Sequence, residues 1–316
     1  MIFRLLVPFG KFLRRKSSLL FLFLIVNCIL LRDANQATNH SSAGDDPEVP
    51  SGEYLLKEEF VSAVARLHRH LSTVRSHCQR MTRMGGLVTC SDCQKCIIDG
   101  GKLLCLDQDV RPVPGSCHAL SFGIGYDLSF ERALVQYGCQ VTAFDPTSVN
   151  LTDMVHPGNI QAIRVGLDER DHEFVQNFTD LQHKKTEQHK MSYKRYQSII
   201  DLLDYPDIQL LKIDIEGSEW KVFSDILSSV EGRNLLENIR QILLEVHLDF
   251  LTSGDDIELI YSYVMQATEV FETLEKLGFY LAAFELNEST LSQYVFNNVT
   301  VDLYKEISLI KRIPKK

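Results

Sequence analysis

The spacing of hydrophobic residues changes along the chain and predicts where helices and strands form. Residues 53–80 carry apolar side chains at roughly helical intervals, which predicts an amphipathic helix. From residue 117 onward, short apolar runs alternate with helical segments, a pattern typical of a parallel sheet with crossover helices. The predicted strands are residues 117–122, 139–144, 160–165, 208–213, 240–246, 278–285 and 304–311.

These elements predict an α/β protein with a seven-stranded, Rossmann-like sheet. A helix over about 128–137 should connect the first two strands, with Gly138 as its C-terminal cap and Asp127 or Ser129 at its start. The last two strands can form an antiparallel hairpin. Residues 168–198 are polar and rich in His and Lys, which predicts a long, exposed connection.

The N-terminal part of the chain has a different composition. A basic tail over 1–18 precedes an apolar run over 19–31, which is shorter than the ~20 residues that cross a bilayer squarely. We interpret the run as a signal-anchor or, alternatively, as a cleaved signal peptide. Residues 32–52 are polar and indicate a flexible stem. A helical and cysteine-rich segment over 53–116 and the sheet-bearing domain over 117–316 complete the expected organisation.

Two further features indicate that the chain beyond the apolar run enters the secretory pathway. Seven of the eight cysteines lie between that run and residue 140, which suits an oxidising compartment. N-x-S/T glycosylation sequons begin at Asn39, Asn150, Asn177, Asn287 and Asn298. We therefore expect a single-pass type II membrane protein of the ER or Golgi lumen, held by its apolar segment, or alternatively a secreted protein.

The cysteines leave several pairings open. Residues 90–105 contain a C-x2-C-x2-C pattern followed by Cys105, which could bind zinc, although an oxidising compartment favours disulfides. Cys117 and Cys139 begin the first two predicted strands, whose ~4.8 Å separation suits a disulfide. We expect that bridge; the alternative is a free thiol at Cys139 with Cys117 paired upstream.

The first predicted strand runs into a Gly-x-Gly turn. Gly123 and Gly125 lack Cβ atoms, so the backbone can bend sharply and lie against a ligand at the carboxyl end of the strand. The dinucleotide-binding fingerprint of dehydrogenases needs a third glycine at position 128, where this chain has Leu128. A tight turn without any cofactor is the alternative interpretation.

Acidic residues follow the second and third predicted strands. Asp145 comes ~20 residues after the glycine turn, where a carboxylate can accept both ribose hydroxyls of a nucleoside. Asp168 follows the third strand and could meet the adenine amino group of the same ligand. Alternatively, Asp145 merely starts a turn before Pro146, and Asp168 is an ordinary loop carboxylate.

The segment over 210–220, LLKIDIEGSEW, is the strongest motif. Strand alternation sends Asp214 and Glu216 to one side, while Ile213 and Ile215 face the core. Two carboxylates in one crevice repel each other and lose hydration, which favours a ligand, a metal or a proton-transfer role. Helix capping and surface solvation are the alternatives.

The fifth predicted strand ends with Glu245 and His247 on one face, next to Asp214 and Glu216 on the neighbouring strand. Asp214, Glu245 and His247 could hold a divalent cation. His247 could instead act as the general base for a hydroxyl acceptor. A structural His–carboxylate pair is the remaining alternative.

The run over 212–219, KIDIEGSE, resembles the signature of FkbM-type S-adenosylmethionine methyltransferases. Residues 117–146, 216–222 and 244–248 are in addition similar to the animal methyltransferase-like protein 24 branch. The resemblance covers about residues 75–312 and implies a seven-stranded methyltransferase sheet with S-adenosylmethionine as cofactor.

Two positions depart from the usual methyltransferase turn. Typical members have an acid two residues before the first glycine and a third glycine two residues after the second. This chain has Ser121 and Asp127 at those positions. The usual contacts to the methionine end of the cofactor are therefore missing, and Asp127 is a candidate replacement for the acid.

We expect a methyltransferase that moves a methyl group from S-adenosylmethionine to an oxygen of a small-molecule or glycan acceptor. The expected cofactor-binding residues are Gly123, Gly125, Asp127, Asp145 and Asp168, and the expected catalytic residues are Asp214, Glu216 and His247. The alternatives are an inactive binding protein on the same fold and, less favoured, another Rossmann-type nucleotide enzyme. A net charge of −9 argues against nucleic acid as a partner.

Overall fold

The computed structural model describes residues 51–91, 95–147, 160–180, 185–203, 207–254, 256–287, 292–296 and 299–312. Tyr54–Lys316 form one compact unit. The apolar run and residues 32–50 of the predicted stem lie outside the described residues, so these interpretations stay predictions, whereas residues 51 and 52 are helical and not part of a flexible stem. Within the described ranges, no helix is long and apolar enough to cross a membrane.

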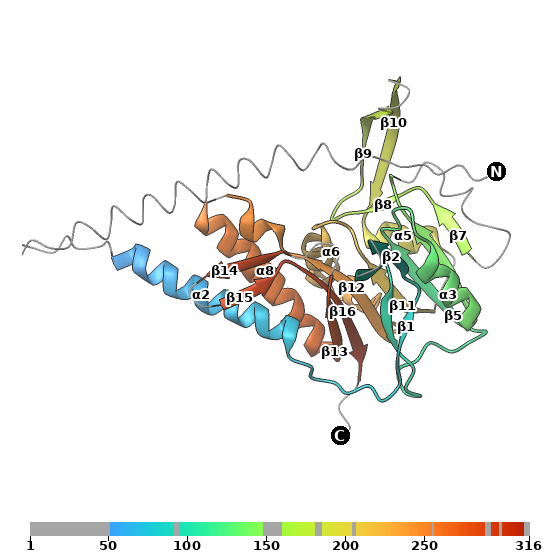
Figure 1. Cartoon of the computed structure of the whole chain (residues 1–316), viewed down its shortest axis with the longest axis horizontal. Coiled ribbons are helices and arrows are strands. Elements are labelled where there is room, and N and C mark those ends of the chain that lie inside the picture. The colour runs from blue at the N-terminus through green and yellow to red at the C-terminus, as the bar shows by residue number, and fades with distance from the viewer. Residues whose placement is uncertain are drawn as a thin grey trace, which may run out of the picture. The chain divides into compact units, whose positions relative to one another are not determined.

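A seven-stranded sheet forms the centre of this unit (Figure 1). Its strands are β5 (Cys117–Phe122), β6 (Cys139–Phe144), β7 (Ile160–Ile163), β11 (Ile208–Ile213), β12 (Gln241–His247), β13 (Phe279–Leu286) and β16 (Tyr304–Lys311). Their spatial order is β13-β16-β12-β11-β5-β6-β7. The five strands from β12 to β7 are parallel, and β16 runs antiparallel to both β12 and β13.

This arrangement confirms the predicted α/β class and the antiparallel pairing of the last two strands. Four of the predicted ranges match β5, β6, β11 and β16 residue for residue. The predicted β7 runs two residues too far at its end, and β12 and β13 are each shifted by one residue. The order reverses between β5 and β11, because the chain returns from β7 to the other side of β5. In open α/β sheets, ligands bind at such a switch point, outside the carboxyl ends of the strands.

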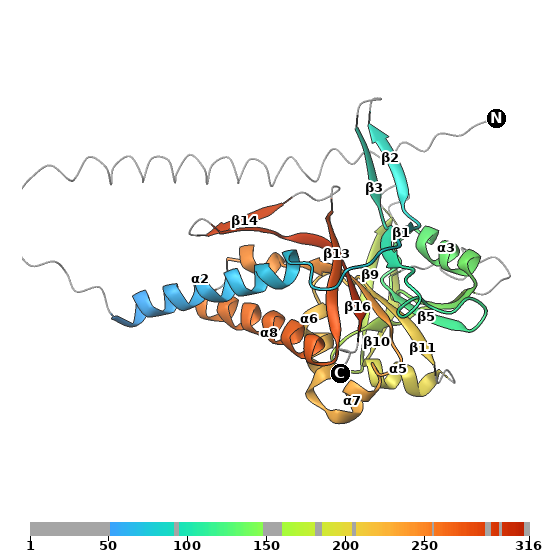
Figure 2. The same cartoon turned by 90° about the horizontal axis from the view of Figure 1, so that it is seen from below.

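One face of the sheet is covered by four helices, α2 (Ser51–Ser72), α5 (Tyr196–Leu202), α6 (Glu219–Ser228) and α8 (Ile257–Lys276). Figure 2 shows α2 alongside α8, where His70 Nδ1 lies 2.9 Å from Glu275. The predicted helix over 53–80 ends earlier, at Ser72. Beyond it, the backbone N–H groups of Arg75 and Ser76 bond to Leu281 on β13, so the chain leaves the helix to join the edge strand.

The opposite face carries α3 (Ser129–Tyr137) and a hairpin of β1 (Met81–Met84) and β4 (Lys102–Cys105). Leu104 of β4 and Phe130 and Leu134 of α3 pack with side chains of β5, β6, β11 and β12 in one cluster. As predicted, α3 ends at Gly138, which has a φ of 111° and closes the helix with two backbone hydrogen bonds. The cysteine-rich segment is therefore part of the covering of the sheet.

The described structure contains disulfides Cys117–Cys139 and Cys78–Cys105. The first confirms the predicted bridge, and the alternative of a free Cys139 is wrong. Cys90 is also disulfide-bonded. Because Cys90 and Cys105 are oxidised, neither is available as a zinc-binding thiolate.

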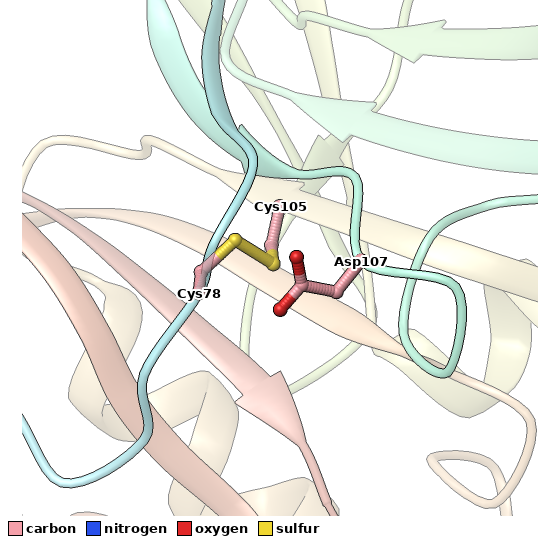
Figure 3. Close-up of side chains that lie close together, drawn as sticks. All are labelled: Cys78, Cys105 and Asp107. Carbon is pink, nitrogen blue, oxygen red and sulfur yellow. A yellow bond between two sulfur atoms is a disulfide. The ribbon is translucent and has the colours of Figure 1, made fainter.

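Asp107 lies beside the Cys78–Cys105 bridge (Figure 3). Its carboxylate accepts hydrogen bonds from the backbone N–H groups of Gln79 and Arg80 and pairs with Arg312 at 2.7 Å. Because the two cysteines are joined and Asp107 is bonded to these partners, the three residues offer no free ligands for a cation. Asp107 instead connects the segment after α2 to Arg312, directly after the C-terminal strand.

The long polar connection contains a ribbon of β9 (His172–Asp180) and β10 (Lys185–Lys194), which the sequence did not indicate (Figure 1). At its base, β10 pairs with β8 (Gly166–Leu167). The remaining elements are β2 (Leu87–Ser91), β3 (Lys95–Asp99), α7 (Val230–Asn234), the short helix Asp249–Thr252, β14 (Gln293–Phe296) and β15 (Val299–Asp302).

Candidate active site

A cavity of about 820 Å³ lies at the carboxyl ends of the central strands. One half is lined by the end of β6, by β8 and by Tyr193 of β10, and the other half by the ends of β11 and β12. The glycine turn after β5 lies between the two halves. The position matches the switch point of the sheet, so one continuous cavity can hold a nucleoside at one end and a second molecule at the other.

Gly123 lets three strand ends approach one another. A Cβ atom at this position would lie 1.6 Å from the carbonyl oxygen of Asp214, and the φ of 77° is one that other residues rarely adopt. Gly125 has a φ of 58°, and a Cβ there would meet no atom within 4 Å. Gly123 is thus required by the close contact with the end of β11, whereas Gly125 presents bare backbone to the cavity.

Asp145 lines the half of the cavity formed by the end of β6 and by β8, but it is 4% exposed and already bonded. One of its oxygens accepts the backbone N–H groups of Ile124 (2.9 Å) and Gly125 (2.8 Å). The other accepts the N–H and the hydroxyl of Thr147, each at 2.7 Å. Burial alone would raise the pKa of Asp145, but these hydrogen bonds lower it below its usual range. A ribose hydroxyl can reach this carboxylate only by displacing one of these donors.

Asp168 and Asp127 were also expected to bind the cofactor, but the carboxylate of each accepts a hydrogen bond from a nearby backbone N–H group. Asp168 is not among the lining residues; its oxygens lie 2.8 Å from the N–H of Glu169 and 3.6 Å from His172. Asp127 lines the cavity, but it accepts both the N–H and the hydroxyl of Ser129 at the start of α3. The N-cap residue is Leu128, between the two predicted candidates Asp127 and Ser129, and Asp127 holds the helix start through its bonds to Ser129.

The polar side chains of the second half share one face of the sheet because alternate residues of a strand point the same way. Lys212, Asp214, Glu245 and His247 lie on the face covered by α3 and the β1–β4 hairpin, while Ile213 is in the core on the opposite face. Ligand atoms of Asp214, Glu245 and His247 lie within 4.8 Å of one another. The structure therefore brings the predicted cation ligands together.

A protein cation already lies among these carboxylates. Lys102 of β4 is 1% exposed, and its Nζ lies 3.2 Å from Asp214, 3.5 Å from Glu245 and in contact with Glu306. Burial alone would lower the pKa of Lys102, but the three carboxylates raise it above its usual range, so the ammonium stays charged. Lys212 adds a second cation, 3.4 Å from Asp214.

The carboxylates of this cluster differ in protonation. Burial alone would raise the pKa of Asp214, but Lys102 and Lys212 hold it well below its usual range. Burial, together with the charges of Glu245 and Asp214, raises the pKa of Glu306 to about 8. Asp214 is therefore ionised at neutral pH, and Glu306 releases its proton at a higher pH than Asp214 does. Asn287, which also lines the cavity, donates a hydrogen bond of 2.5 Å to Glu245.

His247 is held by the helix that follows the β11 motif. Its Nδ1 lies 3.0 Å from Glu219, which is fully buried and also accepts the N–H of Ile215. Its Nε2 lies 3.6 Å from Glu216. Burial alone would lower the pKa of His247, but Glu219, Glu245 and Asp214 raise it to about 9. At neutral pH His247 is thus an imidazolium that positions Glu216.

Glu216 has an unusual backbone. Its φ is 57°, and among the described residues it is the only non-glycine with a positive φ. This left-handed conformation costs roughly 1–2 kcal/mol for a residue with a Cβ. Its side chain is 89% exposed and lines the cavity. A strained, accessible carboxylate at the end of a central strand is a candidate proton acceptor.

Ser121 occupies the position of the missing acid at the end of β5. It is fully buried, and its hydroxyl donates to Glu131 of α3 at 2.6 Å. Glu131 is 1% exposed and lines the cavity between its two halves. Burial, which outweighs the nearby Lys212 charge, raises the pKa of Glu131.

Several of these residues escaped the sequence analysis. Lys102 and Glu306 come from strands far away in sequence, so no local pattern links them to Asp214. Glu131 lies within the segment over 117–146 and Glu219 within the run over 212–219, and their signal is an acidic residue next to buried apolar ones on a helix. Both are helix residues that bond a polar residue of the sheet.

Comparison with known proteins agrees with this geometry. Residues 62–299 match the protein family described as a methyltransferase domain. The protein named probable methyltransferase-like protein 24 in Homo sapiens is 30% identical over 149 residues, which are 46% of this chain and 37% of the human protein. Its Rattus norvegicus counterpart is 28% identical over the same shares. The matched segment thus spans little more than a third of these relatives.

The similarity of this chain to solved structures is weak. The 16S rRNA (adenine(1408)-N(1))-methyltransferase from Catenulisporales acidiphilia is 10% identical with a TM-score of 0.32, and the match covers 64% of this chain and 90% of that one. A mutant of the same protein gives a TM-score of 0.33 at 9% identity, with 64% and 88% covered. Similarities at this level add nothing to the family match. The match over 62–299, together with the sheet order and the cavity at its switch point, establishes that the chain belongs to the methyltransferase-domain family.

Proposed function

We propose that the chain binds S-adenosylmethionine in this cavity and transfers its methyl group to an oxygen of a small-molecule or glycan acceptor. The observation that carries the proposal is the continuous cavity, which joins the Gly123–Gly125 turn and Asp145 at one end to Glu216 and His247 at the other. Bound S-adenosylmethionine would supply an electrophilic methyl group on a positively charged sulfonium. The acidic lining of the cavity suits such a cation.

Different residues of the chain would position the cofactor and remove the proton of the acceptor. The bare backbone at Gly125 allows the adenosine part to lie against the turn, and Asp145 holds that turn by accepting its N–H groups. On the other side, Glu216 would take up the proton that the acceptor hydroxyl loses on receiving the methyl group, and S-adenosylhomocysteine would be the leaving product. His247, held by Glu219, keeps Glu216 in place. Alignment supplies most of the rate, and proton removal adds to it.

We further propose that Lys102 serves as the resident cation of the Asp214 cluster. Its ammonium contacts two carboxylates of the cluster that a divalent ion would need, Asp214 and Glu245. A divalent ion at the same place would meet a buried positive charge at close range, which is strongly unfavourable. The expected Asp214, Glu245 and His247 cation site therefore requires Lys102 to leave.

A catalytically inactive binding protein on the same fold is the second candidate. Ser121 and Asp127, at positions where typical members carry an acid and a glycine, favour it. Such a protein would bind the cofactor without transferring its methyl group.

For the compartment we propose the secretory pathway, with the N-terminal apolar run as a type II anchor or a cleaved signal. Disulfides Cys78–Cys105 and Cys117–Cys139 support an oxidising environment. Asn177 of β9 is exposed and so accessible to a glycan.

Calorimetry of the purified protein tests the cofactor proposal. S-adenosylhomocysteine, NAD and a nucleotide sugar are titrated separately under the same conditions. We expect saturable binding of S-adenosylhomocysteine alone. Preference for NAD or for the nucleotide sugar would show that the cavity serves a different nucleotide chemistry.

A further inference from the structure

Glu131, one of the residues that line the cavity, carries a free acceptor. Its Oε1 accepts the Ser121 hydroxyl at 2.6 Å. Its Oε2 is buried and has no hydrogen-bond partner within the part of the chain that the structure describes. A buried carboxylate oxygen without a donor is unfavourable by a few kcal/mol, so its retention calls for a ligand that supplies the donor.

The other acidic groups near the turn lack this freedom. Both oxygens of Asp127 accept bonds from Ser129, and those of Asp145 accept bonds from the turn and from Thr147. Asp214 is paired with Lys102 and Lys212. Around the glycine turn, Glu131 is thus the carboxylate with an unused oxygen.

The location of Glu131 matches that of the acid that the turn lacks. Ser121 stands at the end of β5, where a methyltransferase turn usually has its acidic residue, and its short side chain leaves room for Glu131 to reach in from α3. The carboxylate has moved from the strand to the helix, and the Ser121 hydroxyl orients it. A carboxyl group beside the turn is thereby retained.

We propose that Glu131 binds the ammonium group of the methionine part of the cofactor, in place of an acid at position 121. This inference rests on the proposed cofactor. The ammonium would donate to Oε2 while Oε1 keeps its bond from Ser121, so both oxygens are satisfied in the complex. Burial of this ion pair makes the interaction selective for ligands that carry an amino group.

The test compares two ligands that differ in the amino acid part. S-adenosylhomocysteine has it, and 5′-methylthioadenosine has the adenosine and thioether but no ammonium. Glu131→Gln keeps the side-chain volume and an oxygen for Ser121 but removes the charge. We expect it to weaken S-adenosylhomocysteine binding about 10- to 100-fold and to leave methylthioadenosine binding within about twofold of the wild-type value.

Two further variants serve as controls for the effect of Glu131→Gln. Glu269→Gln makes the same change on the exposed face of α8 and should leave both affinities unchanged. Ser121→Ala removes only the orienting hydroxyl and should give a smaller loss, again confined to S-adenosylhomocysteine. Circular dichroism confirms that each variant is folded.

Equal binding of S-adenosylhomocysteine by Glu131→Gln and wild type would overturn the inference, as would an equal loss for both ligands. Those results leave the proposed function standing, because the wild-type protein still binds the cofactor product. If the wild-type protein binds neither ligand, the proposed function itself is wrong.

Discussion

At the residue scale, the second half of the cavity combines strain, charge and exposure in neighbouring side chains. Glu216 has a left-handed backbone and an exposed carboxylate, while His247 beside it is buried and charged. Strain of this kind persists only where the surroundings hold it, here through Glu219 and the turn at Gly217. The arrangement costs stability and keeps one carboxylate free, which fits a proton acceptor.

Replacing Glu216 should separate catalysis from binding. We expect Glu216→Gln to lower turnover about 10²- to 10⁴-fold, the usual contribution of a general base, with cofactor affinity unchanged. Glu216→Gly should lose turnover equally but match or slightly exceed the wild-type thermal stability, because glycine relieves the left-handed φ. Methyl-transfer assays and thermal unfolding measure the two effects. Full turnover in Glu216→Gln would remove this residue from the mechanism.

The pKa of His247 predicts how stability depends on pH. The folded value of about 9 lies above the ordinary value of 6.5. The protonated form is therefore favoured in the folded state, and its stabilisation is fully present below pH 6.5 and lost as the pH rises through about 9. At ~1.4 kcal/mol per pKa unit, the loss is up to about 3 kcal/mol.

Chemical denaturation between pH 6 and 9.5 measures this loss. Glu306 titrates in the same range in the wild type and in His247→Gln, so the comparison between the two isolates His247. The variant should show the flatter profile. Parallel profiles for the two proteins would contradict the raised pKa.

At the element scale, the β1–β4 hairpin supplies a buried cation to the sheet, which its local sequence did not predict. It covers one face of the sheet and inserts Lys102 between Asp214, Glu245 and Glu306. The Cys78–Cys105 bridge and the bonds between Gln241 and Cys105 fasten the end of β4. A segment that precedes the sheet in sequence thereby supplies the cation that contacts Asp214 and Glu245, two residues that line the cavity.

Lys102→Met should destabilise the protein by about 3–5 kcal/mol, because it leaves a cluster of carboxylates buried without their cation. Lys190→Met is the matched control: it breaks an exposed 2.7 Å pair with Glu173 and should change little. Thermal unfolding with and without Mg²⁺ tests the cation proposal in the same experiment. We expect Mg²⁺ to leave the wild-type melting temperature unchanged; a clear increase would mean that a divalent ion, rather than Lys102, occupies the cluster.

At the scale of the whole molecule, the sequence predicts the sheet well because its strands are short apolar runs ended by Gly, Asp or Pro. Gly123, Asp145 and Asp214 could be placed at one edge because parallel strands align their carboxyl ends. Their partners could not be foreseen. Lys102 reaches Glu306 across 204 positions, and Glu131 meets Ser121 only once α3 packs on the sheet. The β9–β10 ribbon was missed because its few apolar residues, such as Phe174, Val175 and Met191, are scattered among charged and polar ones and form no continuous apolar run.

The sequons offer a test of the compartment. We expect Asn177 to carry a glycan in animal cells, because it is exposed on β9. Asn287 should not, because its side chain donates to Glu245 at the cavity. Asn177→Gln should therefore lose one peptide-N-glycosidase-sensitive shift on gels, and Asn287→Gln should lose none. A protein without any such shift would contradict the secretory proposal.

The central claim is that one cavity holds the cofactor with its nucleoside toward Asp145 and its sulfur toward Glu216. A crystal structure of the protein with S-adenosylhomocysteine tests it most directly. We predict the adenosine between the Gly123–Gly125 turn and Tyr193, the amino group on Glu131, and the sulfur facing the Asp214 and Glu216 end. Density for the ligand outside this cavity, or with its adenosine beside His247, would contradict the account.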